Sequence, residues 1–61
     1  SQEDYLDIVK SYAKEYKFKI DNSDLEKLAI EWSVTRGSRS GRVAWQFIQD
    51  LAGKLKIKIN Y

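Results

Sequence analysis

The chain has 61 residues and a formal net charge of +2, and 43% of its residues are hydrophobic. This length allows one small domain with one core, and the apolar content is that of a folded chain. Because cysteine and histidine are absent, disulfides, thiolate chemistry, the usual general base and the commonest metal ligand are excluded. No apolar run approaches a membrane span and no signal-peptide pattern opens the chain, so we expect a cytoplasmic protein without a membrane partner.

Methionine is also absent, even at position 1. We therefore expect residues 1–61 to be a single domain that was cut from a longer protein, or a processed product. Ser1 would then be a remnant of expression. The function of the chain would be a part of a larger activity.

The pattern of apolar residues predicts an amphipathic helix over about residues 2–16, with Ser1 as its cap. The next segment, 17–21, alternates polar and apolar residues, which is typical of a short strand.

A second helix is predicted from about Ser23 to Arg36, with a capping-box pair of Ser23 and Glu26 and with Gly37 as the residue that follows its end. Ile30 and Val34 lie four residues apart on a second face, which suggests a neighbour outside the domain. Four apolar residues form the expected core stripe: Leu25, Leu28, Ala29 and Trp32.

A third helix is predicted from Ser40 or Gly41 to about Ala52, ended by Gly53. The remaining segment, 54–61, alternates strictly and predicts a strand, which would pair in parallel with the first one. The fold is then mainly α, with three helices and a short parallel strand pair at about 17–21 and 55–59. The alternative for the second segment is a frayed basic tail.

All arginines of the chain, Arg36, Arg39 and Arg42, fall in one Gly/Ser-rich stretch that leads into the third helix. A guanidinium group offers a planar fork of donors that fits phosphate, and a helix N-terminus binds anions. Arg42 in the first helical turn would oppose the helix dipole, and a residue placed against local preference hints at function. The alternative is a solvated loop that serves solubility.

Other surface features allow two interpretations each. Arg42, Gln46 and Gln49 share a polar face, which is either a ligand or partner surface or the solvent side of the helix. Trp32 and Trp45 could stack on a base, although a core position is expected for Trp32. The lysines of the last segment, Lys54, Lys56 and Lys58, could follow a phosphate backbone or protect an edge strand against aggregation.

Catalytic chemistry has no support in the sequence. Asp4 and Asp7, or Asp24 and Glu26, have no partner at catalytic spacing. No Walker A loop, metal cluster or nucleophile–base pair is present. We expect no catalytic residues, no metal site and no enzyme activity in this chain alone.

The run from Ser38 to Ile48 resembles the sensor-2 region of AAA+ ATPases, in whose helical lid a loop leads into a helix with an arginine and, two positions on, an alanine. Arg42, Ala44, Trp45 and Ile48 match that spacing. The stretch from Trp32 to Phe47 looks closer still to the C-terminal end of a family of bacterial AAA+ ATPases of uncharacterised function, with its R-G-x-R-S-G-R-x-A-x-Q-F signature.

The resemblance implies a helical lid that contributes Arg42 to the phosphates of ATP, with Arg39 as a secondary phosphate or interface contact. ATP and Mg²⁺ would be bound by a core domain of the same chain that is missing here, so the isolated lid would not bind nucleotide tightly. The parent protein would be an ATPase and a homo-oligomer. The implied interface residues are Arg36, Ile30, Val34, Trp45, Gln46 and Gln49. One departure leaves the sensor open between Arg39 and Arg42: many lids have a glycine three positions before the sensor arginine, where this chain has Arg39.

A second hypothesis is a small helical nucleic-acid-binding domain. The loop from Arg36 to Arg42 and the C-terminal lysines would then contact phosphates. A third is a protein-interaction module that uses Ile30, Val34 and Trp45.

Overall fold

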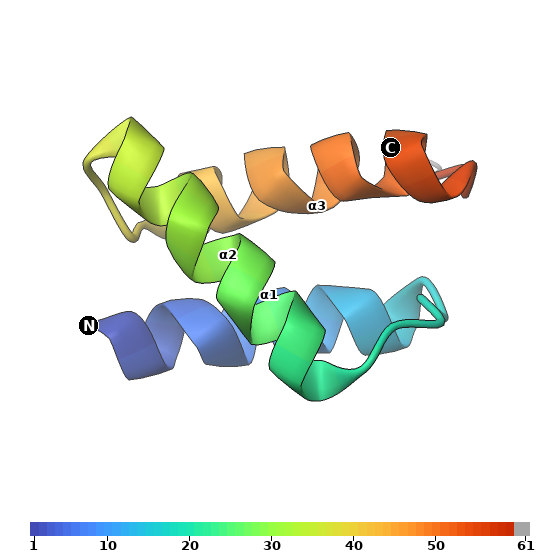
Figure 1. Cartoon of the computed structure of the whole chain (residues 1–61), viewed down its shortest axis with the longest axis horizontal. Coiled ribbons are helices and arrows are strands. Elements are labelled where there is room, and N and C mark those ends of the chain that lie inside the picture. Colours follow the sequence, from blue (N-terminus) through green and yellow to red (C-terminus); the bar gives the residue numbers. More distant parts are fainter. Residues whose placement is uncertain (60–61) are drawn as a thin grey trace.

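The computed structural model describes residues 1–59, which form three helices: α1 (Gln2–Glu15), α2 (Asn22–Arg36) and α3 (Gly41–Leu55). The first and the last helix run in the same direction, and α2 crosses them diagonally on its way back (Figure 1). The prediction of a three-helix fold is confirmed. None of the three helices combines the length and the apolar character needed to cross a bilayer.

The core lies where the three helices meet, and α3 contributes most of it. Its buried face follows the predicted pattern, because Val43, Ala44, Phe47, Ile48 and Leu51 are all buried. The largest fully buried side chains come from all three helices: Tyr5 and Val9 from α1, Leu25 from α2 and Ile48 from α3.

Three of the predicted helix ends are confirmed. The backbone N–H of Asp4 donates to Ser1 Oγ and that of Val43 donates to Ser40 Oγ, both at 3.2 Å, so serines cap α1 and α3. Gly37 follows the end of α2 with a φ of 70°. This left-handed conformation is open to glycine without steric cost.

The predicted capping box at the start of α2 is wrong. The helix begins at Asn22, and its cap residue, Asp21, makes no side-chain capping hydrogen bond. Glu26 does not close a capping box with Ser23 but forms an ion pair with Lys10 of α1. A carboxylate that can reach a cation on the neighbouring helix therefore holds α2 against α1.

The core stripe of α2 is also rotated relative to the prediction. Leu25, Ala29 and Ser33 are buried, whereas Leu28 is 39% exposed and Trp32 is half-buried. Small side chains at positions 29 and 33 let α2 approach its neighbours closely, so the larger residues lie at the margins of the contact.

The predicted strand pair is absent from residues 1–59. The third helix passes Gly53 and ends at Leu55, so little chain remains for the second strand. The part of that segment beyond Ile59 lies outside the described residues.

The reason is that backbone groups needed for a ladder are used to end the helices. The N–H of Phe18 donates to the carbonyl of Ala13 (2.8 Å), and that of Ile57 donates to Ala52 (2.9 Å). The alternating apolar residues instead pack singly against the core, as Phe18, Ile20 and Ile59 do.

Candidate functional site

The candidate site is the end of the molecule where α2 turns into α3. Arg36 is the last residue of α2, Arg39 lies in the connecting loop and Arg42 lies in the first turn of α3. All three side chains are exposed. The three arginines therefore belong to three different structural elements: the end of α2, the loop and the start of α3.

Arg36 contacts its own helix. Its Cζ lies 4.2 Å from the ring centroid of Trp32, one turn earlier, in a cation–π arrangement. Trp32 in turn packs against Phe47 of α3, with ring centroids 6.0 Å apart. The guanidinium of Arg36 thus covers the junction of α2 and α3.

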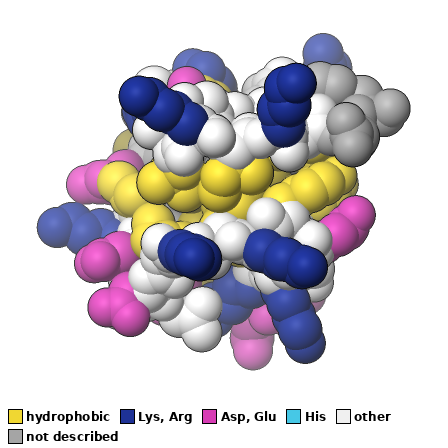
Figure 2. Space-filling view, turned by 90° about the vertical axis from the view of Figure 1, so that its right-hand side faces the viewer, with side chains coloured by type: hydrophobic (Ala, Val, Ile, Leu, Met, Phe, Trp, Pro, Cys, Tyr) yellow, Lys and Arg dark blue, Asp and Glu magenta, His cyan; other side chains and the backbone are white. Residues whose placement is uncertain are grey.

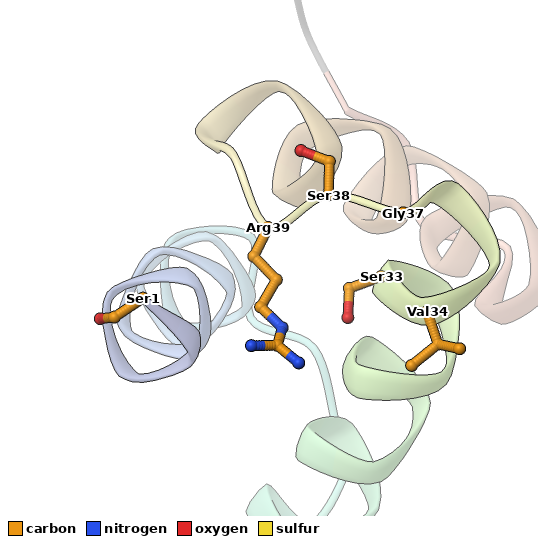
Figure 3. Close-up of a pocket in the computed structure, with 6 residues that line it drawn as sticks. All are labelled: Ser1, Ser33, Val34, Gly37, Ser38 and Arg39. Carbon is orange, nitrogen blue, oxygen red and sulfur yellow. The ribbon is translucent and has the colours of Figure 1, made fainter.

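Arg39 points into a hollow between the beginning of α1 and the end of α2 (Figure 3). The hollow has a volume of about 410 Å³, and its lining includes Ser1, Ser33 and Val34 as well as Arg39. Ser38 points away from it (Figure 3). The loop start is fixed because the N–H groups of Gly37 and Ser38 both donate to the carbonyl of Ser33.

Arg42 has the most rigid support of the three. The turn that carries it is closed by the Ser40 side chain and by a hydrogen bond from the N–H of Ala44 to the carbonyl of Ser40 (3.0 Å). A Cβ atom on Gly41 would lie 3.9 Å from Ile8 Cδ1, so this turn also rests against α1. The N–H groups of Gly41 and Arg42 have no acceptor among the residues that the structure describes.

The charge of this end is uncompensated. Within residues 1–59, no ion pair joins any of the three guanidinium groups to an acidic side chain. The first turn of α3 holds no acidic residue. The helix dipole, the unused N–H groups and the arginine charges therefore all favour an anion here.

The other predicted interface residues divide into two groups. Val34 is 69% exposed and lines the Arg39 hollow, whereas Ile30, on the same face, is half-buried. Trp45 packs on α1, with its ring centroid 5.0 Å from that of Tyr12 and 6.3 Å from that of Tyr16.

Gln46 and Gln49 are half-buried on α3, so of the predicted polar face only Arg42 is fully exposed. The candidate anion site at the start of α3 consists of Arg42 and the N–H groups of Gly41 and Arg42, and Arg39 faces the neighbouring hollow.

Two polar contacts were missed by reasoning from the sequence. The buried Tyr5 donates its hydroxyl to the carbonyl of Ala29 at 2.7 Å, and Ser33, only 2% exposed, donates Oγ to the carbonyl of Ile30 at 2.8 Å. The spacing of Leu25, Ala29 and Ser33 at four-residue intervals was the signal that could have placed Ser33 in the contact.

The donors at this end have the chemistry of an anion site. Guanidinium and backbone N–H donors fit the oxygens of a phosphate group. No group of three or more acidic side chains within residues 1–59 could hold a metal ion.

A family model described as "Protein of unknown function (DUF815)" matches residues 1–55. No curated protein and no solved structure matches the chain significantly.

Proposed function

The chain belongs to the DUF815 family, a bacterial family related to the AAA ATPases, and we propose that it is the helical lid of an AAA+ ATPase. In this proposal Arg42 contacts the phosphates of ATP that a core domain binds with Mg²⁺. The lid then moves against the core as the nucleotide changes.

The observation that carries the proposal is the position of Arg42. It is exposed, has no acidic partner in the described part of the chain, and lies in a turn that Ser40 caps and α1 supports. A guanidinium on such a support stabilises phosphate charge without reorganisation. Loss of the γ-phosphate weakens that contact, so the lid rotates relative to the core domain.

The structure also supports a choice between the three arginines. Arg36 already stacks on Trp32, and Arg39 points toward the hollow between α1 and α2 rather than along α3 (Figure 3). Arg42 is therefore assigned the sensor role, and Arg39 is assigned to the contact between the lid and its core domain.

The proposal is tested in the full-length protein with Arg42→Ala, Arg39→Ala and, as a matched control, Arg36→Ala. A charge-assisted contact contributes about 1.5–3 kcal/mol, so Arg42→Ala should weaken ATP binding or slow its hydrolysis about 10- to 100-fold. Arg36→Ala should leave both within about twofold, because its contact is local. Equal effects of all three substitutions would contradict the assignment of Arg42.

A second experiment addresses the isolated 61-residue chain. We expect no ATP hydrolysis by this chain, because it would supply only part of the site. Titration with a labelled single-stranded oligonucleotide at low and physiological salt tests the alternative of a nucleic-acid-binding domain. Tight binding with a steep salt dependence would favour that alternative over the lid.

A further inference from the structure

Helices α1 and α3 end in the same way at the other end of the molecule. Lys17 and Lys56 both have a φ of 59°, and each directly precedes a residue whose N–H closes the helix. Both segments then continue with an apolar residue and a second lysine: Phe18-Lys19 in one and Ile57-Lys58 in the other.

The left-handed conformation is unfavourable for lysine. A residue with a Cβ atom loses about 1 kcal/mol there relative to glycine, and the end of α2 uses Gly37 at the corresponding position. The backbone at both positions thus goes against local preference, whereas the lysine charges are favourable at the C-terminal ends of α1 and α3.

A cleft of about 230 Å³ lies between the two segments, lined by Lys17, Lys19, Leu55 and Ile57. Figure 2 shows a band of hydrophobic side chains across this end of the molecule, with basic side chains on both sides of it. A cavity of about 150 Å³ admits a benzene molecule. The cleft is thus large enough for one leucine or phenylalanine side chain.

The lysines of the two segments differ in whether they form ion pairs. Lys54 pairs with Asp50 at 3.0 Å. Among residues 1–59, the other lysines of the two segments form no ion pair, and all are exposed: Lys17, Lys19, Lys56 and Lys58.

We propose that this cleft binds an extended acidic segment of another polypeptide. A large apolar side chain of that segment packs against Leu55 and Ile57, and the carboxylates next to it pair with Lys17 and Lys19. Charge complementarity selects the acidic partner, because Lys17 and Lys19 line one wall of the cleft and the aliphatic Leu55 and Ile57 line the other. The proposal is independent of the lid function.

The shape of the cleft distinguishes this partner from two others. A bilayer is bound by apolar side chains that project from the surface, whereas Leu55 and Ile57 line a hollow. Single-stranded nucleic acid is bound by aromatic platforms beside basic groups, and the described lining of this cleft is aliphatic and lysine-bearing.

The test is a fluorescence anisotropy titration of the 61-residue chain with a labelled heptapeptide of alternating glutamate and leucine. We expect saturable binding that weakens as salt is raised. The double variant Lys17→Gly/Lys19→Gln removes the two charges that line the cleft, one of them in a backbone conformation that glycine prefers, so it should still fold and should bind about tenfold more weakly. Lys27→Gln, which removes an exposed charge of α2 outside the cleft lining, should bind as the unmodified chain does.

Two further probes complete the test. A peptide with glycine in place of leucine should bind at least about tenfold more weakly, because it lacks the apolar anchor. Vesicles of phosphatidylserine and phosphatidylcholine should not bind. Equal affinity of the double variant and the unmodified chain, equal affinity of the two peptides, or binding to vesicles without binding to the peptide would overturn the proposal.

Discussion

The two ends of this small bundle are both positively charged but are built in opposite ways. At the arginine end, Gly37 takes the left-handed conformation and Ser40 caps the next helix, so local sequence and structure agree. At the lysine end, Lys17 and Lys56 take that conformation although glycine would fit it better. The comparison teaches that residues at the arginine end suit their backbone conformation, whereas the lysine end combines an unfavourable backbone conformation with charges that favour the helix C-termini.

The largest expected effect concerns the core that both ends share. Tyr5 is fully buried and its hydroxyl joins α1 to α2 through the carbonyl of Ala29. Tyr5→Phe should lower the free energy of unfolding by about 1.5 kcal/mol, because a buried hydrogen bond is lost. Urea unfolding followed by circular dichroism measures this. A change below about 0.5 kcal/mol would mean that the hydroxyl does not connect the helices.

Tyr5 and Lys10 should make the stability of the chain depend on pH. Burial raises the pKa of Tyr5 above its ordinary value of 10.0, and the hydrogen bond to Glu26 raises the pKa of Lys10 above its ordinary value of 10.5. Both groups therefore contribute stability that is fully present below pH 10 and is lost as the pH rises through their raised folded-state pKa values. Thermal unfolding at pH 8 and pH 11 should show the loss, and Tyr5→Phe should reduce it. An unchanged pH dependence in that variant would assign the loss to other groups.

The next two substitutions test the difference between the two ends directly, at the residues with a left-handed conformation. Gly37→Ala should destabilise the chain by about 1 kcal/mol through conformation alone, because a Cβ atom there meets nothing within 4 Å. Lys56→Gly should stabilise it by about 0.5–1 kcal/mol. Chemical unfolding of the two variants measures the sign of each change in the free energy of unfolding. If Lys56→Gly destabilises the chain, the lysine contributes more stability, through a contact or through its charge at the end of α3, than its conformation costs.

Local signals explain which parts of the structure could be predicted. Ser1, Gly37 and Ser40 act through neighbouring backbone groups, so the sequence alone located these helix ends correctly. The strand pair failed because alternation is equally the pattern of a segment that anchors every second residue on a core, as Phe18 and Ile20 do.

The candidate site was predictable only where local signals determine its structure. The first-turn position of Arg42 follows from local capping. The Arg39 hollow depends on Ser1 and Ser33 lying on either side of the same space, and the burial of Ser33 depends on how α2 is rotated against its neighbours. No local pattern specifies that rotation, and Leu28 was placed in the core for this reason.

Removal of the Ser40 cap tests what fixes the first turn of α3 at the arginine end. Ser40→Ala should cost about 1 kcal/mol and fray the turn that holds Arg42. Ser40→Asp keeps an acceptor for the N–H of Val43 and should retain the stability within about 0.5 kcal/mol. Hydrogen exchange at the first turn of α3 separates the two variants, because only the alanine variant should exchange faster there. Equal exchange in both would show that packing against Ile8, not the cap, fixes the turn.

The smallest expected effect concerns Arg36, which lies at the arginine end but belongs to the fold. Its guanidinium stacks on the Trp32 ring at 4.2 Å while remaining exposed, an arrangement that contributes about 0.5 kcal/mol. Arg36→Gln should therefore lower the stability by that amount and shift the fluorescence of Trp32, whereas Arg42→Gln should change neither, because Arg42 has no partner in the described chain. A loss of stability in the Arg42 variant would mean that its charge is already used within the domain, and the case for an external phosphate at this end would fail with it.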